Sequence, residues 1–383
     1  MKKLSTTNLL FALAIFGIAS IFMAHKGNYD SANDHTHADG MTHSHPHDHH
    51  HGEAINQKSD KVQFKTGQGA FVFSYDEELT TSFPTDAKEF EPAMHGGFNE
   101  DPETGIIYTG IPGYGLCAIS ADLKEWKRIG TDERLKDNIH GIVFFIHKGK
   151  KQLAVAQEGK RVLVLNLDGT IVSDILKPKG IEFDFVPAND FFKSADSNFG
   201  VTDVTYLDGT IYAAHGYSKG DFVLTIEEQD GSWDWGRLAW GGKGKAPGQF
   251  QTAHGVYAHE GHILVANRAA GQVVKFRPDG AFVEMFDNIP EGSLICNVAY
   301  KTEHFFFNAL TAIGDDMKSA PIYAHTGKEL VSTIIPGDLD IPVLTNIHHV
   351  WPHQVTQADG SKQLYLLVHG WNKGKYAVLK MEK

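Results

Sequence analysis

Residues 240–282 read WGGKGKAPGQFQTAHGVYAHEGHILVANRAAGQVVKFRPDGAF, and this stretch decides the fold. A loop rich in glycine and proline comes first, and three short apolar runs follow it: Gly255–Tyr257, Ile263–Ala266 and Gln272–Phe276. Turn signals lie at Glu260-Gly261, Ala270-Gly271 and Asp279-Gly280. Short apolar runs separated by tight turns predict a meandering antiparallel sheet.

The same stretch resembles an NHL repeat, which forms one blade of a β-propeller. Four segments carry the resemblance, in this order: Pro-Gly-Gln-Phe, His-Gly-Val, Val-Ala-Asn-Arg and Val-Lys-Phe-x-Pro-Asp-Gly. One blade cannot bury its own faces, so the chain must hold several more.

The composition agrees with an all-β fold. The chain has 383 residues, of which 42% are hydrophobic and 11% aromatic, and its 39 glycines suit short strands and tight turns around a substantial core. A net charge of -12 with no prominent cluster of Lys and Arg argues against a nucleic-acid partner. Cys117 and Cys296 form neither a disulfide framework nor a CxxC metal motif, so we predict small core residues.

Residues 1–24 are predicted to be an export signal or an uncleaved N-terminal anchor. Lys2-Lys3 precedes an apolar run from Leu9 to Ala24, which is too short for a comfortable membrane span. We therefore expect a periplasmic or secreted protein, attached to a membrane only if residues 1–24 remain uncleaved.

Residues 25–60 are rich in histidine and contain almost nothing apolar, which predicts a disordered linker. The histidines are His25, His35, His37, His43, His45, His47, His49, His50 and His51. Imidazoles at such short spacing, with aspartates between them, can chelate zinc, copper or nickel in many overlapping ways. The alternative is a solvated linker whose histidines do nothing specific.

Residues 61–383 are predicted to form a six-bladed propeller. The residue that starts the innermost strand of the opening stretch, before a small or apolar pair, has counterparts at blade-like intervals along the chain. The series is His95, His140, Thr202, His254, Cys296 and His348. Gly69–Tyr75 is predicted to supply the outer strand that the last blade lacks, and so to close the ring. A seven-bladed ring, with residues 61–90 as most of a blade, is the less favoured alternative.

Alternate blades carry candidate ligands for one divalent cation, namely His140, His254 and His348. The innermost strands of a propeller start on the same rim of the central channel, so alternate positions lie about 120° apart and leave a coordination position open. His95 is a candidate fourth ligand. The alternative is that His-Gly recurs at this position for packing or hydrogen bonding.

The alternating histidines resemble those in the catalytic domain of peptidyl-α-hydroxyglycine α-amidating lyase, over roughly residues 90–383. The resemblance implies zinc held by the three histidines, with Tyr217 as catalytic tyrosine and Arg268 as an arginine of the active site. These roles are chemically consistent, because the metal would polarise a substrate hydroxyl, a phenolate or nearby base would take its proton, and arginine would hold a carboxylate. From the residues alone, Tyr217 is equally well a turn aromatic, and Arg268 a partner in a salt bridge between blades.

The chain also departs from the lyase pattern. The segment Tyr108–Pro112 lacks the family's essential arginine, His349 replaces an acidic residue of its calcium site, and its cysteines in blades three and four are missing. We therefore expect this chain to share the fold and the zinc ligands of the lyase family more closely than it shares the reaction.

Three functions remain open. The preferred one is an exported zinc-binding propeller that acts as a monomeric lyase on a small-molecule or peptide substrate. The second is a periplasmic zinc metallochaperone, in which the histidine-rich segment captures metal and exchanges it with a metal-transport binding protein. The third is a non-catalytic interaction scaffold, because propellers host many functions.

Overall fold

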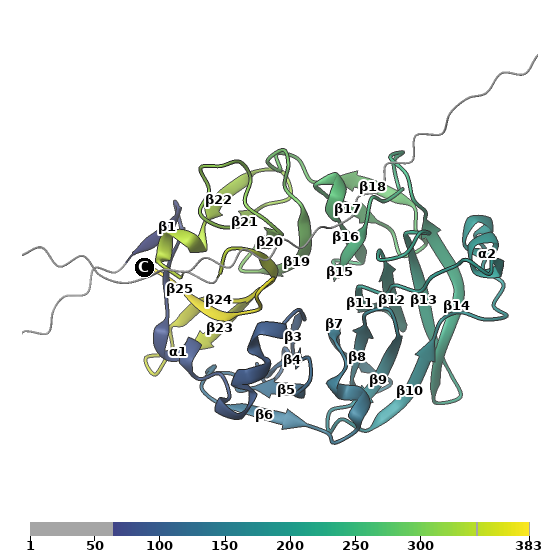
Figure 1. The fold of residues 1–383 in the computed structure, drawn as a ribbon, viewed down its shortest axis with the longest axis horizontal. Coiled ribbons are helices and arrows are strands. Elements are labelled where there is room, and N and C mark those ends of the chain that lie inside the picture. The colour runs from purple at the N-terminus through teal and green to yellow at the C-terminus, as the bar shows by residue number, and fades with distance from the viewer. Residues whose placement is uncertain (1–63, 342–343, 383) are drawn as a thin grey trace, which may run out of the picture. The chain divides into compact units, whose positions relative to one another are not determined.

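The computed structural model describes residues 64–341 and 344–382, which form six antiparallel sheets, here called blades 1 to 6 (Figure 1). Blade 1 consists of β3 (Phe98–Glu100), β4 (Ile107–Ile111), β5 (Gly115–Ile119) and β6 (Trp126–Ile129). Blade 2 consists of β7 (Ile139–His147), β8 (Lys150–Gln157), β9 (Arg161–Asn166) and β10 (Ile171–Leu176). Blade 3 consists of β11 (Asp203–Leu207), β12 (Thr210–His215), β13 (Phe222–Gln229) and β14 (Ser232–Gly241).

The second half of the chain continues the pattern. Blade 4 consists of β15 (Ala253–His259), β16 (His262–Asn267), β17 (Gln272–Phe276) and β18 (Phe282–Met285). Blade 5 consists of β19 (Ile295–Lys301), β20 (His304–Ala309), β21 (Ile322–His325) and β22 (Leu330–Ile334). Blade 6 consists of β23 (Ile347–Thr356), β24 (Lys362–Gly370), β25 (Tyr376–Met381), β2 (Phe71–Tyr75) and β1 (Lys65–Gln68). The helical elements are α1 (Glu77–Thr81), α2 (Val186–Lys193), η1 (Thr85–Ala93), η2 (Glu133–Lys136), η3 (Arg268–Ala270) and η4 (Pro336–Leu339).

The predicted six-bladed propeller is confirmed. The first strand of each blade is innermost, and β3, β7, β11, β15, β19 and β23 contact their neighbours around the ring (Figure 1). Residues 253–276 of the opening stretch form the first three strands of blade 4, as expected. Its first turn holds Glu260 at φ 45° and Gly261 at φ 72°, the left-handed pair that suits the twist of a tight hairpin.

The two ends of the described chain close the ring within blade 6. Strand β2 pairs antiparallel with β25, and Phe73 lies opposite Met381. Gly69–Tyr75 thus supplies the missing outer strand, as predicted. The seven-bladed alternative is wrong, because β1 and β2 extend the last sheet and residues 77–93 are largely helical.

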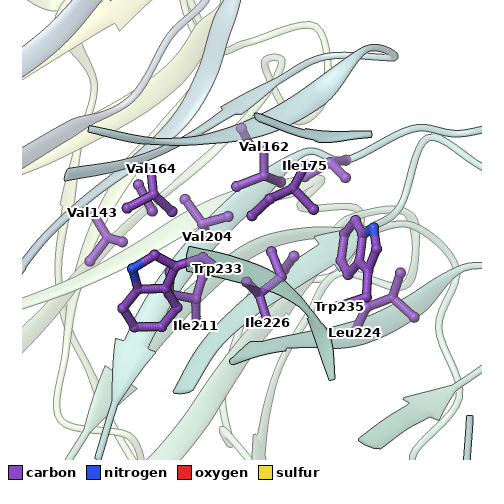
Figure 2. Close-up of a cluster of buried hydrophobic side chains, with 14 of the residues drawn as sticks. Val143, Val162, Val164, Ile175, Val204, Ile211, Leu224, Ile226, Trp233 and Trp235 are labelled. Atoms are coloured by element: carbon purple, nitrogen blue, oxygen red, sulfur yellow. The ribbon is translucent and has the colours of Figure 1, made fainter. Parts of the chain in front are cut away.

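Adjacent blades are held together by apolar side chains packed face to face. Figure 2 shows this packing between blades 2 and 3, where Val143, Val162 and Val164 of one sheet meet Val204, Ile211 and Trp233 of the next. β-Branched residues are stiff and fit such a pleated surface well, which explains their number here.

Hydrogen bonds between neighbouring blades add to this packing near the channel. Backbone amides of blades 2, 4 and 6 donate to side-chain oxygens of the preceding blade. The three bonds are Phe144 N to Asn99 Oδ1 at 2.9 Å, Val256 N to Asp203 Oδ2 at 2.9 Å, and Val350 N to Asn297 Oδ1 at 3.2 Å. The register of neighbouring innermost strands is therefore tied at every second junction.

Several sequence predictions concern other parts of the chain. Cys117 and Cys296 are free and buried, as predicted. The predicted signal and the histidine-rich segment, residues 1–60, lie outside the described residues. Within the described ranges, no helix is long and apolar enough to cross a membrane.

Ring closure makes β2 a sensitive element. Phe73 is fully buried, so we expect Phe73→Ala to lower the free energy of unfolding by about 3–5 kcal/mol. Phe64→Ala serves as the matched control, because this side chain is 53% exposed and should cost less than about 0.5 kcal/mol. Urea denaturation measures both values, and equal costs would contradict the role of β2 in closure.

Candidate metal centre

The four histidines singled out from the sequence meet at one rim of the channel. His140, His254 and His348 lie near the starts of β7, β15 and β23, and His95 lies just before β3. Their rings are in contact. The ring centroids are separated by 4.1 Å for His95–His348, 4.6 Å for His140–His348, 4.8 Å for His95–His140, 4.9 Å for His140–His254 and 5.0 Å for His254–His348.

The nitrogens that gather most closely belong to His95, His140 and His348. One ring nitrogen from each lies within 4.8 Å of the others. The Nε2 atom of His254 faces the hydroxyl of Tyr217 instead, at 3.0 Å. The grouping in the structure thus differs by one residue from the trio favoured by the sequence, since His95 takes the place of His254.

Hydrogen bonds to the neighbouring blade orient two of these rings. His140 Nδ1 lies 2.5 Å from the carbonyl oxygen of Thr202, and His254 Nδ1 lies 2.7 Å from that of Cys296. A carbonyl can only accept, so Nδ1 carries the proton in both rings and Nε2 keeps its lone pair. A carbonyl that accepts from one ring nitrogen in this way fixes the orientation and the tautomer of the ring, and so prepares the other nitrogen for binding a metal.

Burial keeps the cluster neutral. It lowers the pKa of His95 to about 4, with the positive charge of Arg268 adding to the effect. It also lowers the pKa of His140, His254 and His348 well below the usual value; neighbouring histidines contribute at all three, and Arg268 contributes at His140 and His254. All four imidazoles are therefore neutral at neutral pH, and each has one ring nitrogen with a lone pair.

The donor set fits a divalent cation. Both ring nitrogens of His348 are buried without a hydrogen-bond partner, which is costly unless another group satisfies them. A tetrahedral zinc site with bonds of about 2.1 Å separates its nitrogens by roughly 3.4 Å, so nitrogens that now lie up to 4.8 Å apart would need to approach by up to about 1.4 Å. Neutral imidazoles suit zinc, copper or nickel.

Tyr217 and Arg268 lie directly beside the cluster. The Tyr217 hydroxyl is 2.8 Å from a terminal nitrogen of Arg268 and 3.4 Å from His140 Nε2, and the guanidinium stands 5.0 Å from the centroid of the tyrosine ring. Within residues 64–341 and 344–382, no carboxylate forms a salt bridge with Arg268, so it does not join blades as an ion pair. Both side chains face the histidines.

The Tyr217 hydroxyl can donate to one group and accept from another. Burial raises its pKa to about 12, although Arg268 acts in the opposite direction. The hydroxyl is therefore protonated at neutral pH, where it accepts from Arg268 and donates to His254 Nε2.

Sequence reasoning missed three further residues at this rim. The amide nitrogen of Asn138 lies 3.2 Å from His95 Nδ1 and 2.7 Å from Glu158 Oε2, and Trp371 stacks on His95 at 6.2 Å between centroids. Burial raises the pKa of Glu158.

Glu158 and Trp371 could have been found in the sequence by comparing equivalent positions of different blades. Glu158 and Trp371 each follow the second strand of their blade directly, as Arg268 does in blade 4. The strand register agrees, because the preceding residues Gln157, Gly370 and Asn267 pair with the residue just before the rim histidine.

Fold and site together define the class: a six-bladed β-propeller with a candidate metal centre of histidines on its axis. No family model matches the chain, and no curated protein matches it. One similar solved structure is titled "Crystal structure of BBS1N in complex with ARL6DN, soaked with mercury"; it is 12% identical, covers 73% of this chain and 76% of that chain, and has a TM-score of 0.42. The resemblances to NHL repeats and to the amidating lyase remain predictions.

The buried histidines make the fold sensitive to acid. Burial lowers the pKa of three further histidines, His215, His349 and His369, to about 3. In an unfolded chain the pKa of histidine is about 6.5. The unfolded chain therefore binds more protons as the pH falls below about 6.5. We expect each such histidine to reduce the free energy of unfolding by about 1.4 kcal/mol per pH unit between about pH 6 and pH 4, as urea titrations would show.

His215→Gln isolates one of these contributions away from the metal centre. His215 Nε2 accepts a hydrogen bond from Gly200 N at 3.0 Å, and glutamine keeps an acceptor without a titratable charge. The variant should flatten the pH slope by about one proton, or about 1.4 kcal/mol per pH unit. Measurements at pH 8 give the packing cost alone, and an unchanged slope would contradict the prediction.

Proposed function

We propose that the protein is an exported zinc-binding propeller and an enzyme that acts on the hydroxyl group of a small or peptide-derived substrate, similar to the amidating lyase. One observation carries the proposal. The Tyr217 hydroxyl is bonded to Arg268 and to His254 Nε2, and lies next to His140, so a proton-transfer group and a cation adjoin a cluster of neutral imidazoles.

The residues that would hold the metal are His95, His140 and His348, with His254 as the fourth imidazole at the rim. Zinc is favoured because it prefers nitrogen ligands in tetrahedral geometry. When bound, such a cation lowers the pKa of a coordinated hydroxyl and stabilises the negative charge that develops on it.

Tyr217 is the candidate proton acceptor. Burial disfavours its phenolate even with the Arg268 guanidinium at 2.8 Å, so a bound cation would have to add the further positive charge that lets the tyrosine act as a base. Arg268 also presents several donors, which allow it to hold a substrate carboxylate or a developing anion. Trp371, stacked on His95, offers an apolar wall for the remainder of the substrate.

A metallochaperone is the second candidate. The histidine-rich residues 25–60 precede the propeller in sequence, and four imidazoles at the rim would suit a closed site for storage. In this proposal the partner is a metal-transport binding protein. The enzyme and the chaperone differ in whether the metal site keeps a position open for substrate.

Metal analysis tests the centre. The histidine-rich residues 25–60 could bind zinc themselves and would obscure the result, so the protein used should begin at residue 61. This start lies within the compact unit from Asp60 to Lys383. We expect one zinc per chain. His348→Ala should weaken binding by more than the roughly 10- to 100-fold that a lost supporting hydrogen bond costs.

Two further variants sharpen this experiment. His262→Ala, at the turn between β15 and β16, is the matched control and should leave zinc binding unchanged. His254→Ala distinguishes three ligands from four, because only a four-ligand site depends on it. Zinc content that survives His348→Ala would contradict the proposed centre.

Tyr217→Phe tests the enzyme. The variant keeps the ring beside Arg268 and removes only the hydroxyl, so zinc content should be unchanged while cleavage of a peptide ending in α-hydroxyglycine falls by about 10²- to 10⁴-fold. Tyr323→Phe is the control, because it removes another buried hydroxyl, which is bonded to Ser293 and belongs to β21, the third strand of blade 5. If the unaltered protein cleaves nothing and passes zinc rapidly to a metal-free binding protein, the enzyme proposal fails in favour of the chaperone.

A further inference from the structure

A cavity of about 410 Å³ lies on the propeller axis away from the histidines. We call it the distal pocket. Every innermost strand contributes to its lining, and one residue from each is Glu100, Phe145, Tyr206, Tyr257, Lys301 and Trp351.

The strand directions place this pocket toward the opposite end of the channel. All six innermost strands are the first of their blades and run away from the histidine rim. Tyr257 follows His254, and Trp351 follows His348, by three residues, which corresponds to about 10 Å along a strand. The distal pocket is thus separate from the candidate metal centre.

Aromatic rings form much of the wall. Phe145 and Tyr206 stack with centroids 4.6 Å apart, and Tyr257 meets Trp351 edge to face at 6.4 Å. Tyr206, Tyr257 and Tyr300 are only partly buried. Such rings offer flat apolar faces and, at their hydroxyls, polar tips.

The charged groups of the pocket neutralise each other. Lys301 Nζ lies 3.0 and 3.2 Å from the two oxygens of Glu100, which also accepts from Trp351 Nε1 at 3.4 Å and lies 3.0 Å from His353 Nδ1. The pair presents little net charge to a ligand, and this disfavours both anions and organic cations. Its ammonium still has a hydrogen-bond donor to offer, because it carries three and two point at Glu100.

We propose that the distal pocket binds a neutral sugar ring. The C–H faces of a pyranose can stack on tyrosine and tryptophan, and one of its hydroxyls can accept from the remaining donor of Lys301. An aromatic ligand would stack equally well but would leave the third donor of the Lys301 ammonium without an acceptor, which is costly. The volume lies within the range of small-molecule sites, about 300–1,000 Å³. This inference does not depend on the proposed metal chemistry.

The test measures binding of neutral monosaccharides and disaccharides to the full chain. Isothermal titration calorimetry and saturation-transfer NMR detect the binding. Indole and choline serve as aromatic and cationic probes. We expect saturable binding of at least one sugar and none of the two probes. No sugar binding, or binding of indole or choline in its place, would overturn the proposal.

Variants tie the binding to the pocket. Tyr300→Ala should weaken sugar binding by about tenfold or more, which is about 1.4 kcal/mol. Lys301→Met alone leaves Glu100 unpaired, so the double variant Glu100→Gln/Lys301→Met tests the polar contact without a buried charge. Lys275→Met is the matched control, because this lysine of β17 pairs with Glu284 outside the pocket. Sugar binding that all these variants leave unchanged would also overturn the proposal.

Discussion

The antiparallel pairing of β2 with β25 is the constraint on which the rest of the structure depends. It joins the two ends of the described chain within blade 6 and holds that blade between blades 5 and 1. His95 and His348, 4.1 Å apart, are the closest pair in the cluster, and they come from the first and last blades. His369 Nδ1 also donates to the carbonyl oxygen of Gly96 across this junction, at 2.8 Å. Without closure these residues would have no reason to meet, since more than two hundred residues separate them.

Desolvation at the axis sets the chemistry of the site. It keeps the imidazoles neutral, so that each has one ring nitrogen with a lone pair, and it keeps Tyr217 protonated even beside a guanidinium. The Arg268 guanidinium is the one positive group beside the Tyr217 hydroxyl in the described part of the chain. The same burial carries a cost, because neutral histidines must be protonated as the protein unfolds in acid.

The repeat explains how different residues reach one place. Equivalent positions in different blades converge on the axis, so the residue after the second strand is Glu158 in blade 2, Arg268 in blade 4 and Trp371 in blade 6. The same geometry operates further along the innermost strands, where Glu100, Lys301 and Trp351 meet in the distal pocket. A six-bladed ring therefore provides two separate places on its axis where six strands can each contribute a side chain.

The sequence by itself determined the fold, because strand length, alternation and turn residues are local properties that repeat along the chain. The six units, the closing role of Gly69–Tyr75 and the convergence of the rim histidines all followed from that repetition. Only the tertiary structure decided which nitrogens gather, because His254 is turned toward Tyr217 by a hydrogen bond that no spacing reveals. Only the tertiary structure showed that Asn138 supports His95 and that Glu100 pairs with Lys301, since each contact joins different blades. Side-chain orientation at the axis depends on neighbours that are distant in sequence, and the folded ring alone brings them together.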